Sequence, residues 1–455
     1  MTYFDAFDHR KLVHDYPVAE FLQQYRGTSR DELRARQEAR FMDLLGFAWQ
    51  VPFYRRHWGA RGIEPGDIRG LDDLPKLPPY SKADLMASVE AHPPLGDFHG
   101  REIGAPVPMI FHTTSGTTGR PQPLMWGPKS REVQNMLLAR IYRIQGLTER
   151  DVIHSVYGFG LVNGGHYIRE AIQHWLGAQV LTAGTGAETR SAQQVRMMHD
   201  FQATAIVGFG DYIRHLADVA REEGLEPGRD IRIRVISGHL GAENAAELAA
   251  RWGVEHVYDW YGVGDTGVIA AEGPDRDGMH IMEDAQLVEL IEPETLNPVD
   301  DGETGDLVCT CLYKDDIYPV IRFQSQDLTR ILPCENALGL PVRRMAGHLG
   351  RSDNMVKLRG VNVYPQGVGA IVVGGFEAAT GEYVCLVKKD GDRTEMTVMV
   401  EVSARPDGLQ TQMEMLLKTR LGVQIRVELA APGDTAALTQ LESRQKPIRL
   451  IRQSP

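Results

Sequence analysis

The stretch ATAIVGFGDYIRHLADVAREEGLEPGRDIRIRVISG, residues 203–238, decides the fold. It begins with a short apolar run, continues with a segment in which apolar residues recur at helical spacing, and ends with a second apolar run. A strand, a helix and a strand in this order form a βαβ unit, in which the two strands lie parallel in one sheet. The stretch therefore predicts an α/β fold.

The same alternation continues on both sides of this stretch. Further strand candidates are VIHSVYG (152–158), AQVLTAG (178–184) and VEHVYDWYG (254–262), and further helix candidates are SAQQVRMMHD (191–200) and AENAAELAARWG (242–253). Residues 105–270 are therefore predicted to form a mainly parallel sheet flanked by helices. Upstream, residues 30–58 are predicted to be helical, with Ser29 as the N-cap.

The pattern changes in the second half of the chain. Residues 279–332 are predicted to form β-hairpins joined by acidic turns, and hence a β-rich subdomain. Residues 351–455 are predicted to form a small C-terminal α+β domain. The large N-terminal domain would then comprise residues 1–350.

Composition argues against several classes of protein. The 455 residues carry a formal net charge of −12, whereas a nucleic-acid-binding protein presents a basic face. The longest apolar run is about half of what a membrane-spanning helix needs, and the charged N-terminus predicts no secretory signal. The four cysteines, none in a C-x-x-C pair, are typical of a cytoplasmic protein. Cys309 and Cys311 lie in a predicted strand, which indicates core positions rather than metal ligands.

The stretch TTSGTTGRPQP, residues 113–123, is too rich in hydroxyl groups and glycine to build a core. It lies between a predicted strand, VPMIFHT, and a predicted helix, KSREVQNMLLARIYRIQG. Backbone N–H groups can converge on an anion where glycine permits close approach, so the stretch is a candidate phosphate-binding loop. The Walker A pattern is absent. A surface loop without a ligand is the alternative.

Four further segments decide between these alternatives. They are DWYGVGDTG (259–267), YPVIRFQSQDLTRIL (318–332), GRSDNMVKLRGVNVYP (350–365) and SRQKPIRLI (443–451). Together with residues 113–123, these segments resemble the motifs of the adenylate-forming enzymes, the acyl-CoA synthetase superfamily, in both their sequences and their order along the chain. VPFYRRHWGARGIEPGDIRGLDDLPKLP (51–78), GMHIMEDAQLVELIEPET (278–295) and GVNVYP (360–365) resemble phenylacetate-CoA ligase and related aryl-CoA ligases.

The resemblance implies an acid–thiol ligase that acts in three steps. ATP would activate an aromatic carboxylic acid to acyl-AMP, pyrophosphate would leave, and coenzyme A would accept the acyl group. ATP, Mg²⁺ and CoA are the implied cofactor and co-substrates, and a homodimer is expected by analogy. Two alternatives stay open: transfer to a carrier-protein thiol, an amine or a hydroxyl group, and nucleotide binding without catalysis.

The resemblance also implies which residues hold the phosphates. The phosphate loop is matched by Thr114, Ser115, Gly116, Thr117, Thr118 and Gly119. The family usually has lysine where this chain has Gln122, so Arg120 is expected to supply the charge. Tyr261, Gly262 and Asp265 match a motif that ends in glutamate in most relatives, and Asp265 is expected to bind Mg²⁺ on the phosphates.

The adenosine site is implied in the same way. Asp327 matches the acid that accepts both ribose hydroxyl groups, and Arg351 the arginine that reinforces it. One face of the adenine would be lined by Gly241, Ala242 and Glu243, and the other by Asp259, Trp260 and Tyr261.

The remaining matches concern the moving domain and the acid. Asp353 matches the hinge, and Lys446 the lysine that reaches the α-phosphate and the substrate carboxylate. The acyl pocket is expected to be formed by Tyr157, Phe159, Gly164 and Gly238, with Gly262 also in its floor, because aromatic and glycine residues suit a flat ring. His166 is a candidate for contact with a ring substituent, and a structural histidine is the alternative.

Overall fold

The computed structural model describes residues 1–114, 121–241, 243–359, 361–390, 393–441 and 447–453. Contacts divide the chain into two units. The first comprises Met1–Ile153, Phe159–Thr182 and Asp259–Gly347, and the second comprises His154–Gly158, Ala183–Tyr258 and His348–Pro455. The C-terminal residues thus share a unit with residues 183–258, and the domain boundary expected at residue 350 stays a prediction.

The N-terminal part of the first unit is helical. Its elements are η1 (Phe4–Ala6), α1 (His9–Asp15), α2 (Phe21–Arg26), α3 (Arg30–Ala48), α4 (Pro52–Gly59), η2 (Leu71–Lys76) and α5 (Lys82–Ala91). Ser29 caps α3 as predicted and forms a capping box with Glu32. The helix predicted over residues 30–58 is divided into two, because Pro52 has no N–H to continue α3 and instead begins α4.

The phosphate-loop candidate lies between two paired strands of the first unit. The elements in this region are β1 (Tyr80–Ser81), β2 (Ile110–Thr113), β3 (Pro123–Trp126), α6 (Pro128–Ile144), α7 (Gly164–Glu170), the π-helical turn η3 (Ala171–Leu176) and β5 (Gln179–Thr182). Strands β2 and β3 are antiparallel, with Thr113 opposite Pro123. The two ends of the stretch 113–123 therefore lie side by side.

The later strands of the first unit form an antiparallel sheet in the order β11-β12-β13-β14-β10-β9-β8. They are β8 (His256–Val263), β9 (Gly267–Glu272), β10 (Met279–Ile281), β11 (Gln286–Ile291), β12 (Thr304–Cys311), β13 (Val320–Leu332) and β14 (Arg344–Met345). This pairing confirms the hairpins predicted for residues 279–332. Cys309 and Cys311 are buried in β12 with free thiols, as expected of core cysteines.

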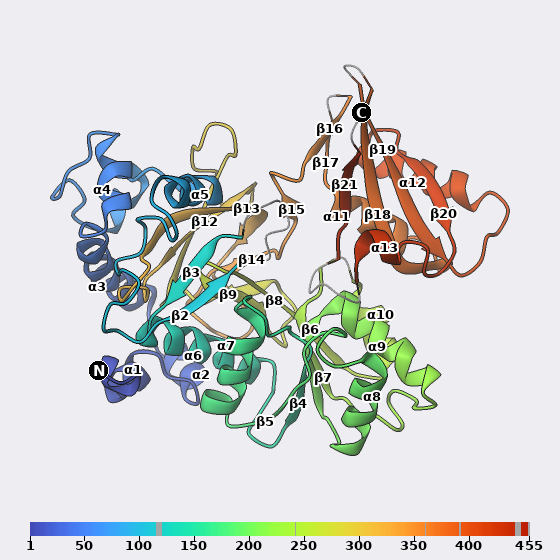
Figure 1. The fold of residues 1–455 in the computed structure, drawn as a ribbon, viewed down its shortest axis with the longest axis horizontal. Helices are drawn as coiled ribbons and strands as arrows, with labels where there is room; N and C mark the ends of the chain where they lie inside the picture. The colour runs from blue at the N-terminus through green and yellow to red at the C-terminus, as the bar shows by residue number, and fades with distance from the viewer. Residues whose placement is uncertain (115–120, 242, 360, 391–392, 442–446, 454–455) are drawn as a thin grey trace. The chain divides into compact units, whose positions relative to one another are not determined.

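The second unit contains the βαβ unit predicted from residues 203–238 (Figure 1). Its first part comprises β4 (Val152–Ser155), α8 (Ser191–Asp200), β6 (Ala205–Phe209), α9 (Gly210–Glu222), β7 (Val235–His239) and α10 (Ala245–Trp252). Strands β6 and β7 are parallel, with Gly208 opposite Gly238, and α9 connects them. The alternation of short apolar runs with amphipathic helices was therefore sufficient to predict this part of the fold.

The C-terminal part of the second unit is the predicted small α+β structure (Figure 1, orange to red). It comprises β15 (Gly350–Arg351), β16 (Val356–Leu358), β17 (Val361–Val363), α11 (Pro365–Gly374), β18 (Ala379–Asp390), β19 (Arg393–Val402), α12 (Leu409–Leu421), β20 (Arg426–Ala430), α13 (Ala436–Thr439) and β21 (Leu450–Gln453). The sheet order is β20-β19-β18-β21. Val372 of α11 and Met413 of α12 share one buried cluster with Val398 and Val400 of β19.

None of the helices in the described ranges combines the length and the apolar composition that a membrane span requires.

Candidate active site

The two ends of the phosphate-loop candidate are tied together. The backbone N–H of Thr114 donates to the carbonyl of Gln122 at 3.1 Å, and the N–H of Gln122 donates to Thr114 Oγ1 at 3.1 Å. Lys82, at the start of α5, donates from Nζ to Thr114 Oγ1 at 3.3 Å. The predicted phosphate ligands Ser115, Gly116, Thr117, Thr118 and Gly119, together with Arg120, lie outside the described residues.

Lys82 is a cation that sequence reasoning missed. It follows Ser81, which caps α5, and it lies more than 30 positions before the motif that it contacts. No local pattern connects the two segments.

Asp265 is held by the residue that departs from the family pattern. Its Oδ1 accepts hydrogen bonds from Gln122 Nε2 at 2.7 Å and from the Tyr318 hydroxyl at 3.0 Å. The side chain of Gln122 is fully buried, and Asp265 is 4% exposed. Gln122 and Asp265, the two site positions that the resemblance predicts to depart from the family pattern, are therefore direct partners.

The second oxygen of the Asp265 carboxylate is available to a ligand. Within the described residues, Oδ2 accepts no hydrogen bond, whereas Oδ1 accepts two. Burial raises the pKa of Asp265 above its usual value, and the donors Gln122 and Tyr318 and the charge of Lys314 oppose this shift. A buried carboxylate with one open oxygen suits a cation that brings its own positive charge.

Lys314 contacts the backbone of Asp265 rather than its carboxylate. Its Nζ donates to the carbonyl oxygen of Asp265 at 2.8 Å and lies 3.6 Å from the centroid of the Trp126 ring. Burial lowers the pKa of Lys314 to about 8. The lysine thus places a positive charge behind the carboxylate without neutralising it through a direct ion pair.

The predicted ribose ligand Asp327 is reached by a predicted adenine-binding residue. The hydroxyl of Tyr261 in β8 donates to Asp327 Oδ2 at 2.6 Å. Strand β13 carries two extra residues between Gln324 and Leu328 relative to β12, and Gln326 in this bulge has a φ of 63°. A bulge re-aims the side chains next to it, so this irregularity determines where Asp327 points.

The other residues of β8 that were predicted to line the site differ in their burial and contacts. The backbone N–H of Asp259 donates to Glu272 at 2.8 Å, and Asp259 itself is half-buried. Trp260 is buried and its ring meets that of Tyr167 edge-on at 6.5 Å. At Gly262 a side chain would meet the carbonyl oxygen of Gly267 at 2.5 Å, so the close β8–β9 hairpin requires glycine there.

The predicted adenine-binding segment Gly241–Glu243 belongs to the second unit. Gly241 has a φ of 66°, a conformation that glycine adopts without strain, and Ala242 lies outside the described residues. The Glu243 side chain is 6% exposed, and its Oε1 accepts from Arg214 Nε at 2.9 Å. The acidic side chain of this segment is therefore occupied by an ion pair.

The predicted hinge and the predicted ribose arginine contact each other. Arg351 donates from Nε and Nη2 to the two carboxylate oxygens of Asp353 at 2.7 and 2.8 Å. Both side chains are about one-third exposed, which suits a reversible pair. Lys446 lies outside the described residues.

An aromatic cluster stands at the carboxyl ends of β6 and β7, where α/β folds bind ligands. Tyr157, which follows β4, donates its hydroxyl proton to the carbonyl of Gly208 at 3.1 Å. His239 Nδ1 lies 2.9 Å from the Tyr157 hydroxyl oxygen, and because this hydroxyl donates its proton to Gly208, Nδ1–H is the donor to it. The rings of Phe209 and His239 stack at 5.1 Å. The Tyr157 ring meets both of these rings edge-on, so Tyr157 is part of an aromatic cluster with polar atoms at its edge.

The remaining residues predicted to form the acyl pocket belong to different units: Gly238 to the second, and Phe159 and Gly164 to the first. Gly238 pairs with Gly208 across β6 and β7, and a side chain there would meet the Gly208 carbonyl oxygen at 1.7 Å. Strand packing therefore requires this glycine. In the first unit, Gly164 begins α7. His166 Nε2 contacts the carbonyl oxygen of Phe159 and lies 3.0 Å from that of Gly160, which favours the structural histidine.

Comparison with known proteins identifies the family of this chain. Residues 81–310 match the AMP-binding enzyme family, and residues 360–450 match the AMP-binding enzyme C-terminal domain. The phenylacetate-coenzyme A ligase of Aromatoleum evansii is 33% identical over 90% of this chain and 93% of its own length. The enzyme of the same name from Escherichia coli K12 is 34% identical over 82% of this chain and 83% of its own.

Solved structures extend the similarity to three dimensions. A 2-hydroxyisobutyryl-CoA ligase in the postadenylation state, in complex with 2-HIB-AMP, has a TM-score of 0.83 at 29% identity, covering 93% of this chain and 90% of that one. The same enzyme with 2-HIB-AMP and CoA in the thioesterification state has a TM-score of 0.67 at 28% identity, covering 94% and 90%.

Proposed function

The chain belongs to the AMP-binding enzyme family, and we propose that it is an ATP-dependent aryl-CoA ligase. The reaction joins a carboxylate to the α-phosphate of ATP, releases pyrophosphate, and transfers the acyl group from AMP to the thiol of coenzyme A. Four relatives that are phenylacetate-coenzyme A ligases match at 31–34% identity. They disfavour a carrier protein, an amine or a hydroxyl group as acceptor.

The first unit supplies the groups for the triphosphate. Lys82 and Thr114 stand at the neck of the loop, and Asp265 presents one open carboxylate oxygen beside it. Mg²⁺ fits this donor set, because it prefers one or two carboxylates and takes its other ligands from phosphate and water. Among the described residues, no group of three metal-ligating side chains offers a closed cage instead. When bound, Mg²⁺ would neutralise part of the phosphate charge.

The observation that supports an aromatic substrate is the cluster of Tyr157, Phe209 and His239. At the carboxyl ends of these parallel strands, the stacked rings of Phe209 and His239 offer a flat face for a planar acid, and the Tyr157 ring meets both of them edge-on. The phenol and imidazole add polar atoms at its edge. A benzoate or arylacetate, with or without a hydroxyl or amino group on the ring, is the acid class that fits.

A panel of acids tests this proposal. Pyrophosphate release is measured with benzoate, hydroxy- and aminobenzoates, phenylacetate and C8–C16 fatty acids, each with and without CoA. We expect the highest kcat/KM with an aromatic acid, and thioester only when CoA is present. Preference for long fatty acids contradicts the aromatic assignment, and turnover with another nucleophile in place of CoA contradicts the ligase assignment.

A second candidate substrate is a short hydroxylated aliphatic acid. The specific reason is the TM-score of 0.83 with a 2-hydroxyisobutyryl-CoA ligase. Tyr157 and His239 would suit a hydroxyl group as well as a ring substituent. Including 2-hydroxyisobutyrate in the panel decides between the two classes, since only one acid class can show the higher kcat/KM.

The proposal extends to the location, oligomeric state and domain movement of the enzyme. Four free cysteines support a reducing cytoplasm as its location. A homodimer is proposed by analogy alone and is tested by light scattering or sedimentation. The small C-terminal domain, residues 351–455, is proposed to move during the reaction, with Asp353 as its hinge.

A further inference from the structure

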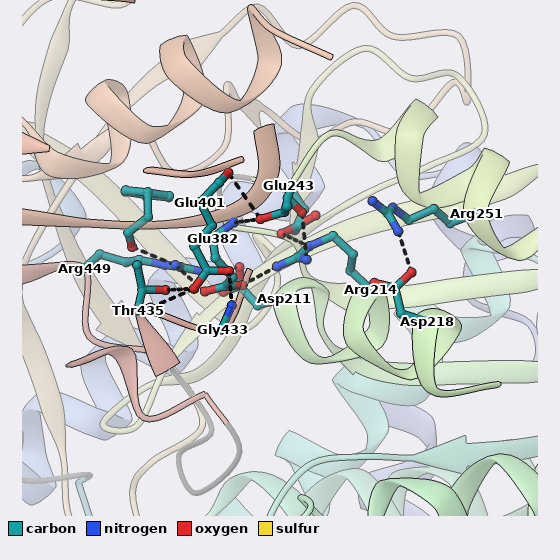
Figure 2. Close-up of polar contacts among 12 residues, drawn as sticks. Asp211, Arg214, Asp218, Glu243, Arg251, Glu382, Glu401, Gly433, Thr435 and Arg449 are labelled. Atoms are coloured by element: carbon teal, nitrogen blue, oxygen red, sulfur yellow. Dashed lines mark hydrogen bonds and ion pairs between the residues drawn. The ribbon is translucent and has the colours of Figure 1, made fainter. Parts of the chain in front are cut away.

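A buried cluster of ion pairs joins two distant parts of the second unit (Figure 2). Arg214 on α9 contacts the carboxylate of Glu382 on β18 and donates to the carbonyl of Thr380 at 3.0 Å. In the opposite direction, Arg449, just before β21, donates to Asp211 on α9 at 2.6 Å. Each of the two parts thus gives one arginine to an acid of the other.

Each arginine also has an acid partner in its own part of the chain. Arg214 pairs with Glu243 at 2.9 Å, and Arg449 pairs with Glu382 at 2.9 Å. If the two parts separate, both arginines keep one carboxylate and the exposed groups gain water. The cluster can therefore open and close with the loss of the cross pairs alone. Breaking a single buried ion pair would instead leave a buried charge without a partner, which is strongly unfavourable.

The cluster is well shielded while it is closed. The side chains of Arg214 and Glu382 are 8% and 10% exposed, and those of Arg449 and Asp211 are 12% and 17% exposed. In the low-dielectric surroundings of such groups, geometry decides whether an ion pair is favourable. The closed cluster therefore specifies one orientation of residues 348–455 against α9.

Two observations connect this orientation with the reaction. The chain is more similar to a relative in the postadenylation state than to the same relative in the thioesterification state. Arg449 also follows the predicted lysine, Lys446, by three residues, and Arg214 holds Glu243 of the predicted adenine-binding segment. The cluster thus contains Glu243 of one segment predicted to contact the nucleotide, and Arg449 is close in sequence to the other.

We propose that Arg214 and Arg449 are positioning residues that hold the C-terminal domain in its orientation for adenylation, and that their cross pairs with Glu382 and Asp211 break before thioester formation. The proposal rests on the ligase function proposed above. It assigns no contact with substrate to either arginine. Their effect is on the half-reaction that needs this orientation, and on that half-reaction alone.

The test uses one variant on each side of the cluster. Arg449→Gln and Asp211→Asn each remove the same cross pair from opposite parts of the chain. Both half-reactions are measured in single turnover: pyrophosphate release from ATP and the best acid of the panel, and thioester formation from synthetic acyl-AMP and CoA. We expect adenylation to slow at least tenfold, with thioester formation unchanged within twofold or faster.

The double variant and two controls sharpen this test. Because both changes remove the pair between Arg449 and Asp211, the double variant should be no slower than Arg449→Gln, which also removes the pair with Glu382. Arg449→Lys keeps the charge and should recover part of the adenylation rate. Arg251→Gln removes the 2.6 Å pair with Asp218, which joins α9 and α10 and does not reach the C-terminal part, and it should leave both half-reactions unchanged (Figure 2).

Hydrogen exchange separates this proposal from the proposed function. Backbone amides of residues 210–222 and 379–390 should exchange faster in Arg449→Gln and in Asp211→Asn, but not in Arg251→Gln. This readout needs no substrate, so it applies even if no acid of the panel is activated. Unchanged exchange in both variants, or equal loss in both half-reactions, overturns the positioning role.

Discussion

Two buried charged regions of this molecule are built on opposite plans. Around Asp265, neutral donors hold one carboxylate oxygen, and the nearest buried cation, Lys314, contacts the backbone rather than the carboxylate. Around Arg214 and Arg449, every charge has a charged partner. The first arrangement leaves an open oxygen for a ligand. The second leaves nothing open and instead connects two parts of the chain.

The difference shows how a protein uses a buried charge. In the proposed assignment Asp265 receives a cation, and its buried carboxylate has no ion pair but accepts hydrogen bonds from Gln122 and Tyr318, which offset part of the cost of burial. Charges that must hold two segments in one orientation are paired across the boundary between them. The predictions below test this distinction, beginning with the largest expected effect.

Removing the cation carried by the C-terminal part should have the largest effect. Lys446→Ala should slow adenylation by on the order of 10²–10³, as loss of one preorganised donor to a developing charge does. Thioester formation from pre-made acyl-AMP should stay nearly intact. Rapid-quench measurement of both half-reactions checks this, and equal loss in both would assign Lys446 a structural role.

Removing the charge of Asp265 should come next. Asp265→Asn should weaken use of Mg·ATP by roughly 2–3 kcal/mol, about 30- to 150-fold in kcat/KM, because a charge-assisted contact is lost. Gln122→Met keeps the charge and removes one hydrogen bond, so its effect should be near 1 kcal/mol. The measurement is the dependence of pyrophosphate release on ATP and Mg²⁺. Parent-like kinetics in Asp265→Asn would mean that another acid serves the metal.

Lys314 should make folding stability depend on pH. The lysine is charged up to about pH 8 in the folded chain, against a usual pKa of 10.5. Between these values the unfolded chain binds more protons, so stability rises with pH in this window. Relative to Lys314→Met, the parent should gain at most about 1.4 kcal/mol per pH unit from pH 8 to 10.5. Denaturant unfolding checks this, and Arg251→Gln should show no such change relative to the parent.

Lys82 should have the smallest effect. Lys82→Met removes a partly exposed cation at the neck of the phosphate loop, which should weaken ATP binding by about 1 kcal/mol, roughly fivefold in KM for ATP. Lys76→Met is the matched control, because Lys76 forms an exposed ion pair with Asp73 on η2. A loss of equal size in both variants would indicate a general charge effect rather than contact with ATP.

Hydrophobic periodicity and cap residues were sufficient for the local structure of this protein. Strand, helix and strand in residues 203–238, the Ser29 cap of α3 and the hairpins of residues 279–332 all follow from patterns that act over a few residues. Family resemblance then identified the ligase and named candidate residues such as Asp265 and Asp327. These predictions needed no knowledge of distant contacts.

Contacts between distant segments were decided only by the tertiary structure. Gln122 and Asp265 are 143 positions apart, and Arg449 and Asp211 are 238 apart, so no local pattern connects either pair. The bulge that directs Asp327 also depends on how β13 is paired with β12. A sequence determines which side chains a segment carries, whereas the partner of a buried charge depends on which segments the fold brings together.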